Sequence, residues 1–82
     1  MNIAVSLKDE DLVMIFTENE ALTPEVVEAA MRWKNLDVVD VYEVRDDELQ
    51  YYCYDPLWST PSFEAGVLKN AERWFAKHPE AV

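Results

Sequence analysis

The sequence predicts an α+β fold of the order ββαββα, a two-layer sandwich in which a four-stranded antiparallel sheet carries two helices on one face. Three observations predict it. Short apolar runs alternate with polar residues, charged turns at 8–11 and 45–48 separate these runs, and a Thr-Pro pair opens each of two helical patterns. The turns and the Thr-Pro pairs recur 37 positions apart, at Lys8 and Arg45 and at Thr23 and Thr60. The chain is therefore read as one domain, 1–82, with pseudo-repeat units 1–36 and 37–78 that arose by duplication or by convergence.

The first unit begins with a predicted hairpin. Residues 3–7 alternate between apolar and small or polar side chains, and residues 12–17 are rich in β-branched and aromatic types. A four-residue loop at 8–11 would place Leu7 opposite Leu12, with Val5 opposite Met14 and Ile3 opposite Phe16. All six side chains would then lie on one face of the sheet.

A helix is predicted next, from Thr23 to about residue 35. Thr23 fits the N-cap position, and Pro24 fits the first helical position, where its missing N–H is not needed. Apolar residues at helical spacing, among them Val26, Ala30 and Trp33, predict one buried face.

The second unit is predicted to repeat the hairpin, with strands at 38–44 and 49–54 joined by the turn at 45–48. The same pairing rule would set Val44 opposite Leu49 and Tyr42 opposite Tyr51, with all four facing the helices. Cys53 would lie on the same face, as an apolar core residue. Tyr51 is thus predicted to be a core residue.

The second helix is predicted from Thr60, again an N-cap before a proline, to about His78, because Pro79 cannot continue a helix. Its apolar stripe is the most regular pattern in the chain. Gly66 interrupts the stripe at a cost of about 1 kcal/mol relative to alanine, which predicts a close contact with the sheet there.

Alternation also predicts an apolar second face of the sheet, one that no helix covers. The residues expected there are Ala4, Val13, Ile15, Val39, Val41, Tyr52 and Tyr54. The open face of an antiparallel sheet is normally polar, and an exposed apolar patch usually marks an interaction site. We therefore expect this face to bind a second copy of the chain or another protein. The alternatives are that the strands curl, or that the loop at 55–62 folds back and Trp58 covers the patch.

Composition limits the partners. The net charge is −10, with 17 acidic residues against seven Lys and Arg, so direct binding to nucleic acid or to anionic lipid is disfavoured and binding to a basic protein is favoured. No apolar run approaches the ~20 residues that span a bilayer. One cysteine and the lack of a signal-peptide pattern lead us to expect a cytoplasmic protein.

Catalytic and metal chemistry are not expected. One His and one Cys cannot form a zinc site, the acidic blocks lack the ligand pattern of a calcium loop, and a single Gly cannot form a phosphate-binding loop. Asp40 and Glu43 could pair as acid and base, but alternation puts them on different faces. The sequence therefore favours a protein without cofactor, metal or enzymatic activity.

The acidic turns are the strongest candidate site. If both hairpin turns project from the same end of the sheet, they form one negative surface from Asp9, Glu10, Asp11, Asp46, Asp47 and Glu48. Tyr52, Tyr54 and Trp58 are candidate anchors beside the apolar residues Val13, Ile15 and Val41. Inhibitors that imitate the charge of DNA, such as anti-CRISPR proteins, share this small size, acidity and aromatic content.

Three hypotheses follow, of which a small-ligand or catalytic domain is the least favoured. The first is a non-enzymatic, acidic protein-binding module, an inhibitor or immunity-like protein that docks on a basic partner such as a nucleic-acid-binding enzyme. The alternative is a homodimeric accessory or regulatory protein that pairs through its open sheet face. Two simpler explanations of the acidity stay open: charged residues suit solvated turns, and acidic surfaces suit a salty cytoplasm.

Overall fold

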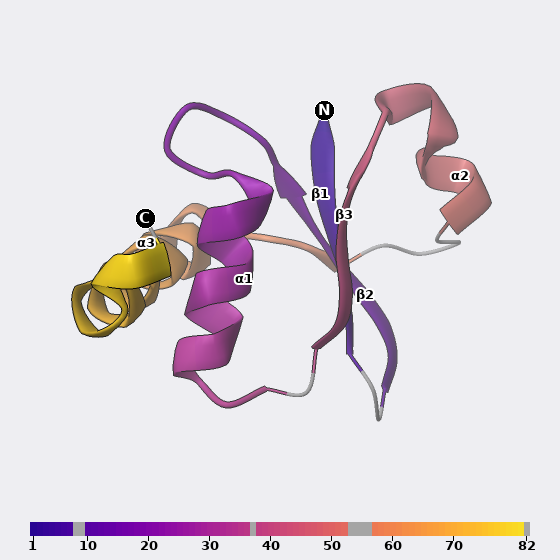
Figure 1. Cartoon of the computed structure of the whole chain (residues 1–82). Coiled ribbons are helices and arrows are strands. Elements are labelled where there is room, and N and C mark those ends of the chain that lie inside the picture. Colours follow the sequence, from indigo (N-terminus) through magenta and orange to yellow (C-terminus); the bar gives the residue numbers. More distant parts are fainter. Residues whose placement is uncertain (8–9, 37, 53–56, 82) are drawn as a thin grey trace.

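A computed structural model of the chain describes residues 1–7, 10–36, 38–52 and 57–81, and the side chains at 1–7, 14–36, 40–51 and 57–80. The elements follow one another as β1 (Asn2–Leu7), β2 (Glu10–Thr17), α1 (Pro24–Trp33), β3 (Val38–Val44), the 3-10 turn η1 (Asp46–Glu48), α2 (Leu49–Tyr52), β4 (Leu57–Trp58), α3 (Pro61–Lys77) and η2 (Pro79–Ala81). The fold class is α+β with a four-stranded sheet, as expected (Figure 1).

The sheet is mixed rather than antiparallel throughout. Its strand order is β3-β1-β2-β4, in which β1 pairs antiparallel with β2 and β3, and the two-residue β4 lies parallel to β2. The predicted return strand at 49–54 is wrong, because residues 46–52 form η1 and α2 instead. This helical segment begins with three acidic residues. Their negative charges stabilise it, because they lie at the positive end of the helix dipole. The second unit thus lacks the hairpin of the first, and the predicted repeat is not confirmed.

The pairing of β1 with β2 largely follows the predicted register. Ile3 lies opposite Phe16 and Val5 opposite Met14, as expected. The pairing of Leu7 with Leu12 is wrong, because the register shifts between Ser6 and Leu7 and places Leu7 opposite Glu10. Such an irregularity adds residues to one strand and bends it at the end of the ladder.

The faces of β3 are the reverse of those predicted. Val41 lies opposite Val5 in the ladder with β1, so it packs against the helix-covered core, whereas Tyr42 and Val44 pack on the other face with Ala4. The prediction failed because it set the register of β3 from a partner strand at 49–54 that does not form. Strand side chains alternate with a period of two, so the wrong neighbour exchanges the two faces.

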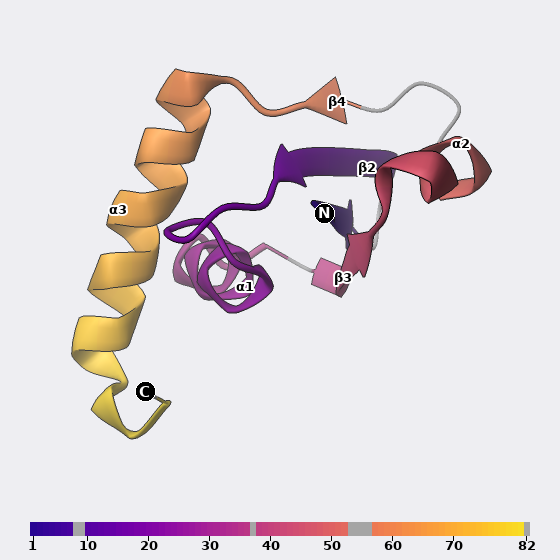
Figure 2. The same ribbon diagram turned by 90° about the horizontal axis from the view of Figure 1, so that it is seen from above.

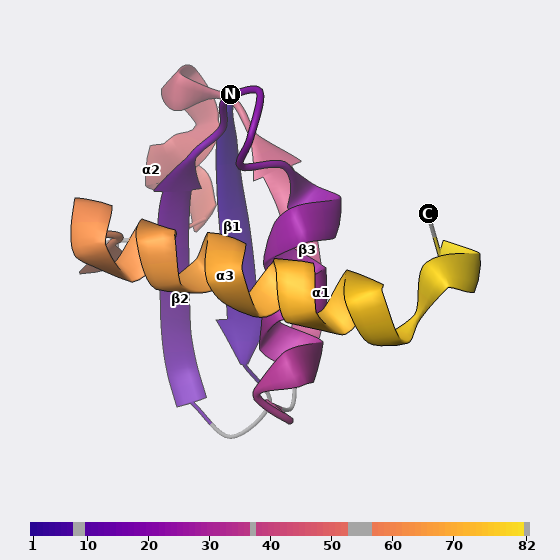
Figure 3. The same ribbon diagram turned by 90° about the vertical axis from the view of Figure 1, so that its left-hand side faces the viewer.

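The two long helices lie on one face of the sheet, as predicted (Figures 1 and 3). Thr23 caps α1 by accepting a hydrogen bond from the Val26 N–H at 3.4 Å, and Thr60 caps α3 by accepting one from the Phe63 N–H at 3.2 Å. Helix α3 ends at its C-cap His78. Figure 3 shows that α1 runs along the strands while α3 crosses in front of them and of α1. The main core fills this layer, with Ile3, Val5, Phe16, Leu22, Val27 and Val67 among its buried residues.

A second, smaller core lies on the opposite face, where the sequence predicted an open surface. Helix α2 lies on that side of the sheet (Figure 2). Ala4, Ile15 and Val44 form a buried cluster there, and Tyr42 and Leu49 pack against it. Ile15 is 0% exposed, so the prediction that it faces solvent or a partner is wrong. The chain covers this part of the face itself, with a segment that the sequence had assigned to the sheet.

Candidate functional site

Carboxylates gather at the end of the sheet where β1 begins. Asn2 lies opposite Thr17 of β2 and Val44 of β3, so the residues that follow those two strands meet at this end. We call this surface the acidic end, and it consists of Glu18, Glu43, Asp46, Asp47 and Glu48. It also lies close to the N-terminus, because the Glu18 N–H donates to the Met1 carbonyl at 3.1 Å.

Glu18 and Glu43 form a close carboxyl pair within the acidic end. The pKa of Glu18 is raised above its ordinary value, first by desolvation and then by the hydrogen bond with Glu43 and repulsion from its charge. Glu25 adds further repulsion, and the N-terminal amino group opposes it. The Glu18 carboxylate is therefore less stable in the fold than in water, and a cation placed beside the pair would stabilise it.

The acidic turn η1 is fixed to the sheet by a buried side chain. Asn2 is 3% exposed, and its Nδ2 donates to the Val44 carbonyl at 3.3 Å and to Oδ1 of Asp46. Arg45 pairs with Glu48 and, at 3.6 Å, with Asp47. Exposed ion pairs of this kind contribute little to stability. The Asn2 contacts therefore hold Asp46 in place, while Asp47 stays largely accessible.

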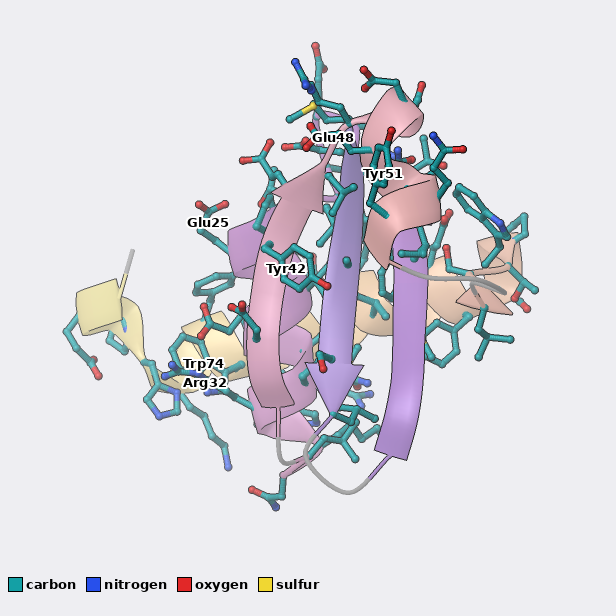
Figure 4. The ribbon with its side chains drawn as sticks, turned by 90° about the vertical axis from the view of Figure 1, so that its right-hand side faces the viewer. Glu25, Arg32, Tyr42, Glu48, Tyr51 and Trp74 are labelled. Carbon is teal, nitrogen blue, oxygen red and sulfur yellow. The ribbon has the colours of Figure 1, made fainter. Side chains whose placement is uncertain are left out.

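An exposed aromatic residue stands beside the acidic turn. Tyr51 of α2 is 78% exposed. Figure 4 shows it next to Glu48 at the same end of the molecule, with Tyr42 farther from that end. The prediction that Tyr51 is a core residue is wrong, because it lies on a helix and not on a strand. The run of Asp46, Asp47 and Glu48 before Leu49 is typical of a helix start, and this pattern could have identified the segment.

The two acidic blocks do not form one surface. Leu7 pairs with Glu10 and Val38 at one end of β1, whereas Asn2 pairs with Val44, just before the second block, at the other end. Five residue steps at about 3.3 Å put the blocks roughly 17 Å apart. Of the first block, Asp9 lies outside the described residues and Glu10 and Asp11 are described in backbone only. The described backbone therefore places Glu10 and the second block at opposite ends of β1, so the expected single surface of six carboxylates is wrong, whereas Glu18 and Glu43 lie at the same end of the sheet as the second block.

The apolar candidates are dispersed. Ile15 is buried and Val41 packs toward the helices, so neither belongs to an exposed patch. Trp58 is 48% exposed on β4, where its backbone pairs with Ile15 in the ladder. Tyr54 and the side chains of Val13, Val39 and Tyr52 lie outside what the structure describes.

A groove between α1 and α3 is a second surface feature, and it has a volume of about 510 Å³. Ala30, Met31 and Val67 are buried residues of its lining, and Leu36 and Phe63 are exposed residues of it. Gly66 also lines it, and a Cβ added at that glycine would meet nothing within 4 Å. The predicted close contact of Gly66 with the sheet is therefore wrong.

Within the described part of the chain, no group of three or more His, Cys, Asp and Glu residues is arranged to hold a metal ion. Nor does that part contain a helix with the length and apolarity to cross a bilayer. Comparison with known protein families, curated protein sequences and solved structures finds no match to this chain. The surface chemistry of the molecule is thus the basis for assigning a function.

Proposed function

We propose that this protein is a non-enzymatic binding module, an inhibitor or immunity-like protein, that docks its acidic end on a basic protein partner. The observation that supports the proposal is the crowding of Glu18 against Glu43, on the same end of the sheet as the three carboxylates of η1. An unfavourable carboxylate pair on the surface is relieved when a Lys or Arg side chain of a partner enters between the two groups.

The distribution of charge along the chain favours docking through the acidic end. Residues 1–60 contain 14 acidic and four basic residues and so carry the whole net charge of −10, whereas residues 61–82 contain three of each. Two cations of the helical layer are engaged with aromatic rings, since Arg32 lies 5.9 Å from the ring centre of Trp74 and Lys77 lies 5.2 Å from that of Trp33. The field of the molecule therefore attracts a cationic surface toward the part formed by residues 1–60, which includes the acidic end, rather than toward α3.

Tyr51 supplies an aromatic group for such a contact. Tyr, Trp and Arg dominate the residues on which protein complexes depend, and Tyr51 presents most of its ring beside Glu48. Carboxylates spaced along an exposed edge, with an aromatic ring next to them, suit a groove that normally holds nucleic acid. A nucleic-acid-binding enzyme is accordingly the class of partner that we favour.

The alternative of a homodimer through an open sheet face loses its main support in this fold. The centre of that face is occupied by Leu49 and Tyr42, which pack on Ala4, Ile15 and Val44. A second copy would find the central apolar residues already covered. The acidic end is therefore the better-supported surface.

A pair of variants with equal charge tests the proposal. Asp47→Asn with Glu48→Gln removes two charges from the acidic end, and Glu72→Gln with Glu80→Gln removes two from the exposed surface of α3 and η2. An oligolysine peptide serves as the basic probe, and its Kd is measured by fluorescence anisotropy over a range of salt concentrations. The first variant should weaken binding several-fold at low salt, and the difference should fade as salt screens the charges.

The control decides whether location matters. If both variants weaken binding equally, only net charge is involved and the acidic end is not a site. The same variants can be used in a pull-down at low salt. A specific partner should be retained by the control variant and lost by the Asp47/Glu48 variant, whereas proteins that adhere to any acidic surface should bind both variants alike.

A further inference from the structure

The outer edge of β3 is an open hydrogen-bonding edge of the sheet. The strand order is β3-β1-β2-β4, so β3 is the last strand on its side (Figure 2). An edge strand bonds to its one neighbour through every second residue, and the residues between direct their N–H and C=O groups outward. Such an edge can accept an extended segment of another protein as an additional strand.

The pairing within the sheet determines which residues of β3 face outward. The Ile15 carbonyl accepts a hydrogen bond at 2.9 Å from the residue that follows β4, so Ile15 bonds on the β4 side and its partner Ala4 bonds on the β3 side. Ala4 lies opposite Tyr42, which therefore directs its backbone groups to β1. Val41 and Glu43 direct theirs to the open edge. Within the described part of the chain, no backbone hydrogen bond to these outward groups is formed.

Carboxylates line this edge. Glu43 is exposed and lies beside Glu18, and Glu25 of α1 is near enough to repel the charge of Glu18. Figure 4 shows Glu25 on the side of β3 that is away from β1. Asp40 is also exposed, and alternation places it on the other face of β3 from Glu43. A strand that pairs with this edge therefore meets negative charge on both of its faces.

Charge decides which strand fits the edge. A second copy that paired through its own β3 would bring its Asp40 and Glu43 against these carboxylates, and like charges across a strand pair are destabilising. The net charge of −10 also opposes that contact at longer range. A lysine or arginine opposite Glu43 would instead lie on the same face, with about 5 Å between the Cβ atoms, and would be attracted by Glu43, Glu18 and Glu25. The edge therefore favours a basic segment.

We propose that the outer edge of β3 binds an extended segment of the partner protein as an additional antiparallel strand, with a lysine or arginine of that segment opposite Glu43. Val41 and Glu43 exchange backbone hydrogen bonds with the segment, and the carboxylates beside the edge attract its charge. This inference rests on the proposed function for the basic character of the partner. It adds the mode of recognition, in which backbone groups contribute as well as charge.

A short peptide of alternating lysine and threonine, as long as β3, tests the edge. In the antiparallel pair the lysine opposite Glu43 directs its backbone N–H to β3, whereas the threonines direct theirs to solvent. Three peptides of equal charge are compared by fluorescence anisotropy at low salt: the unmodified peptide, one methylated at the backbone nitrogens of its lysines, and one methylated at those of its threonines. Methylation at the lysines should raise the Kd by about ten-fold or more, and methylation at the threonines should leave it unchanged.

Amide hydrogen exchange locates the contact on the wild-type chain. In the free chain the Tyr42 amide should be protected by its bond to β1, and the Val41 and Glu43 amides should exchange freely. The unmodified peptide should slow exchange at Val41 and Glu43 by about ten-fold or more.

A charge variant and its control complete the test. Glu43→Gln removes a charge and keeps the backbone edge, so it should raise the Kd of the unmodified peptide several-fold at low salt. Glu72→Gln removes the same charge from the exposed surface of α3 and should leave the Kd unchanged.

Equal affinities of the three peptides, or binding without slower exchange at Val41 and Glu43, would overturn the inference. The proposed function would remain, because the peptide would then be bound by charge alone. The reverse result is also distinguishable. If the peptide slows exchange at both amides and binds the Asp47→Asn, Glu48→Gln variant as tightly as the wild type, the edge is the binding site and the acidic turn is not part of it. If none of the three peptides binds at low salt, the edge does not accept a basic strand and the inference is wrong.

Discussion

Replacing Ile15 with valine tests the main correction to the sequence-based fold, which is that Leu49 of α2 packs on the second face of the sheet, over the buried cluster of Ala4, Ile15 and Val44. The matched control is Ile3→Val. Both isoleucines are 0% exposed, and they lie on opposite faces of the same hairpin. Ile15 belongs to the cluster on which Leu49 and Tyr42 pack, whereas Ile3 lies in the core beneath the helices. Each substitution removes one methylene group in a strand, so β-propensity is nearly unchanged.

The expected loss follows from burial. One buried methylene contributes about 0.8 kcal/mol, and measured Ile→Val changes in cores cost roughly 0.5–1.5 kcal/mol because a small cavity remains. We therefore expect the free energy of unfolding to fall by about 1 kcal/mol in each variant. A domain of this size has a total stability of roughly 4–12 kcal/mol, so both variants should stay folded at 25 °C.

Urea unfolding followed by tryptophan fluorescence measures both losses. For a small domain the dependence of the unfolding free energy on urea is about 1 kcal/mol per molar, so each midpoint should shift by roughly 1 M. If Ile3→Val loses about 1 kcal/mol and Ile15→Val loses close to nothing, the second face is in contact with water and α2 does not cover it. That result would refute the reasoning and restore the exposed apolar face.

Three further predictions each concern a single residue. Thr60→Ala removes the N-cap of α3 and should lower the unfolding free energy by about 1 kcal/mol in the same assay, whereas Thr60→Ser should lose far less; equal losses would contradict the capping role. Gly66→Ala should raise the unfolding free energy by about 1 kcal/mol, since the added methyl meets no neighbour, and a loss would show that the position is crowded. Glu18→Gln should raise the thermal midpoint at pH 7. The raised pKa means that the folded state holds the proton more tightly than the unfolded state, so the wild-type chain gains stability as pH falls and the difference should vanish below about pH 4. If Glu18→Gln raised the thermal midpoint by the same amount at every pH, repulsion between the carboxylates would not be the cause of the gain.

The elements that the sequence identified correctly are those encoded by neighbouring residues. The N-caps Thr23 and Thr60, each followed by proline, fixed the starts of α1 and α3, and Pro79 fixed the end of α3 at His78. The hairpin of β1 and β2 was also found, including the pairing of Ile3 with Phe16, because a short loop leaves few registers. Capping and hairpin formation depend on groups within a few residues of one another, so a local pattern contains the information.

Only part of the candidate site could be predicted from such local patterns. Asp46, Asp47 and Glu48 were named from the sequence. Glu18 and Glu43, at the same end of the sheet, were not recognised as a pair, because the pairing of β1 with both β2 and β3 brings them together. The predicted union of the two acidic blocks failed for the same reason. It depended on a second hairpin, and β1 instead separates the blocks by its full length.

The sequence by itself determined the composition of the layers: an acidic chain, a hairpin, two capped helices and their buried faces. Tertiary structure alone decided which strand lies beside which, and with it the faces of β3, the cover over Ile15 and the position of the carboxylates. The physical reason is that a strand satisfies half of its backbone hydrogen bonds with a neighbour that can lie anywhere along the chain. Side-chain alternation has a period of two and is equally compatible with either face until that neighbour is fixed.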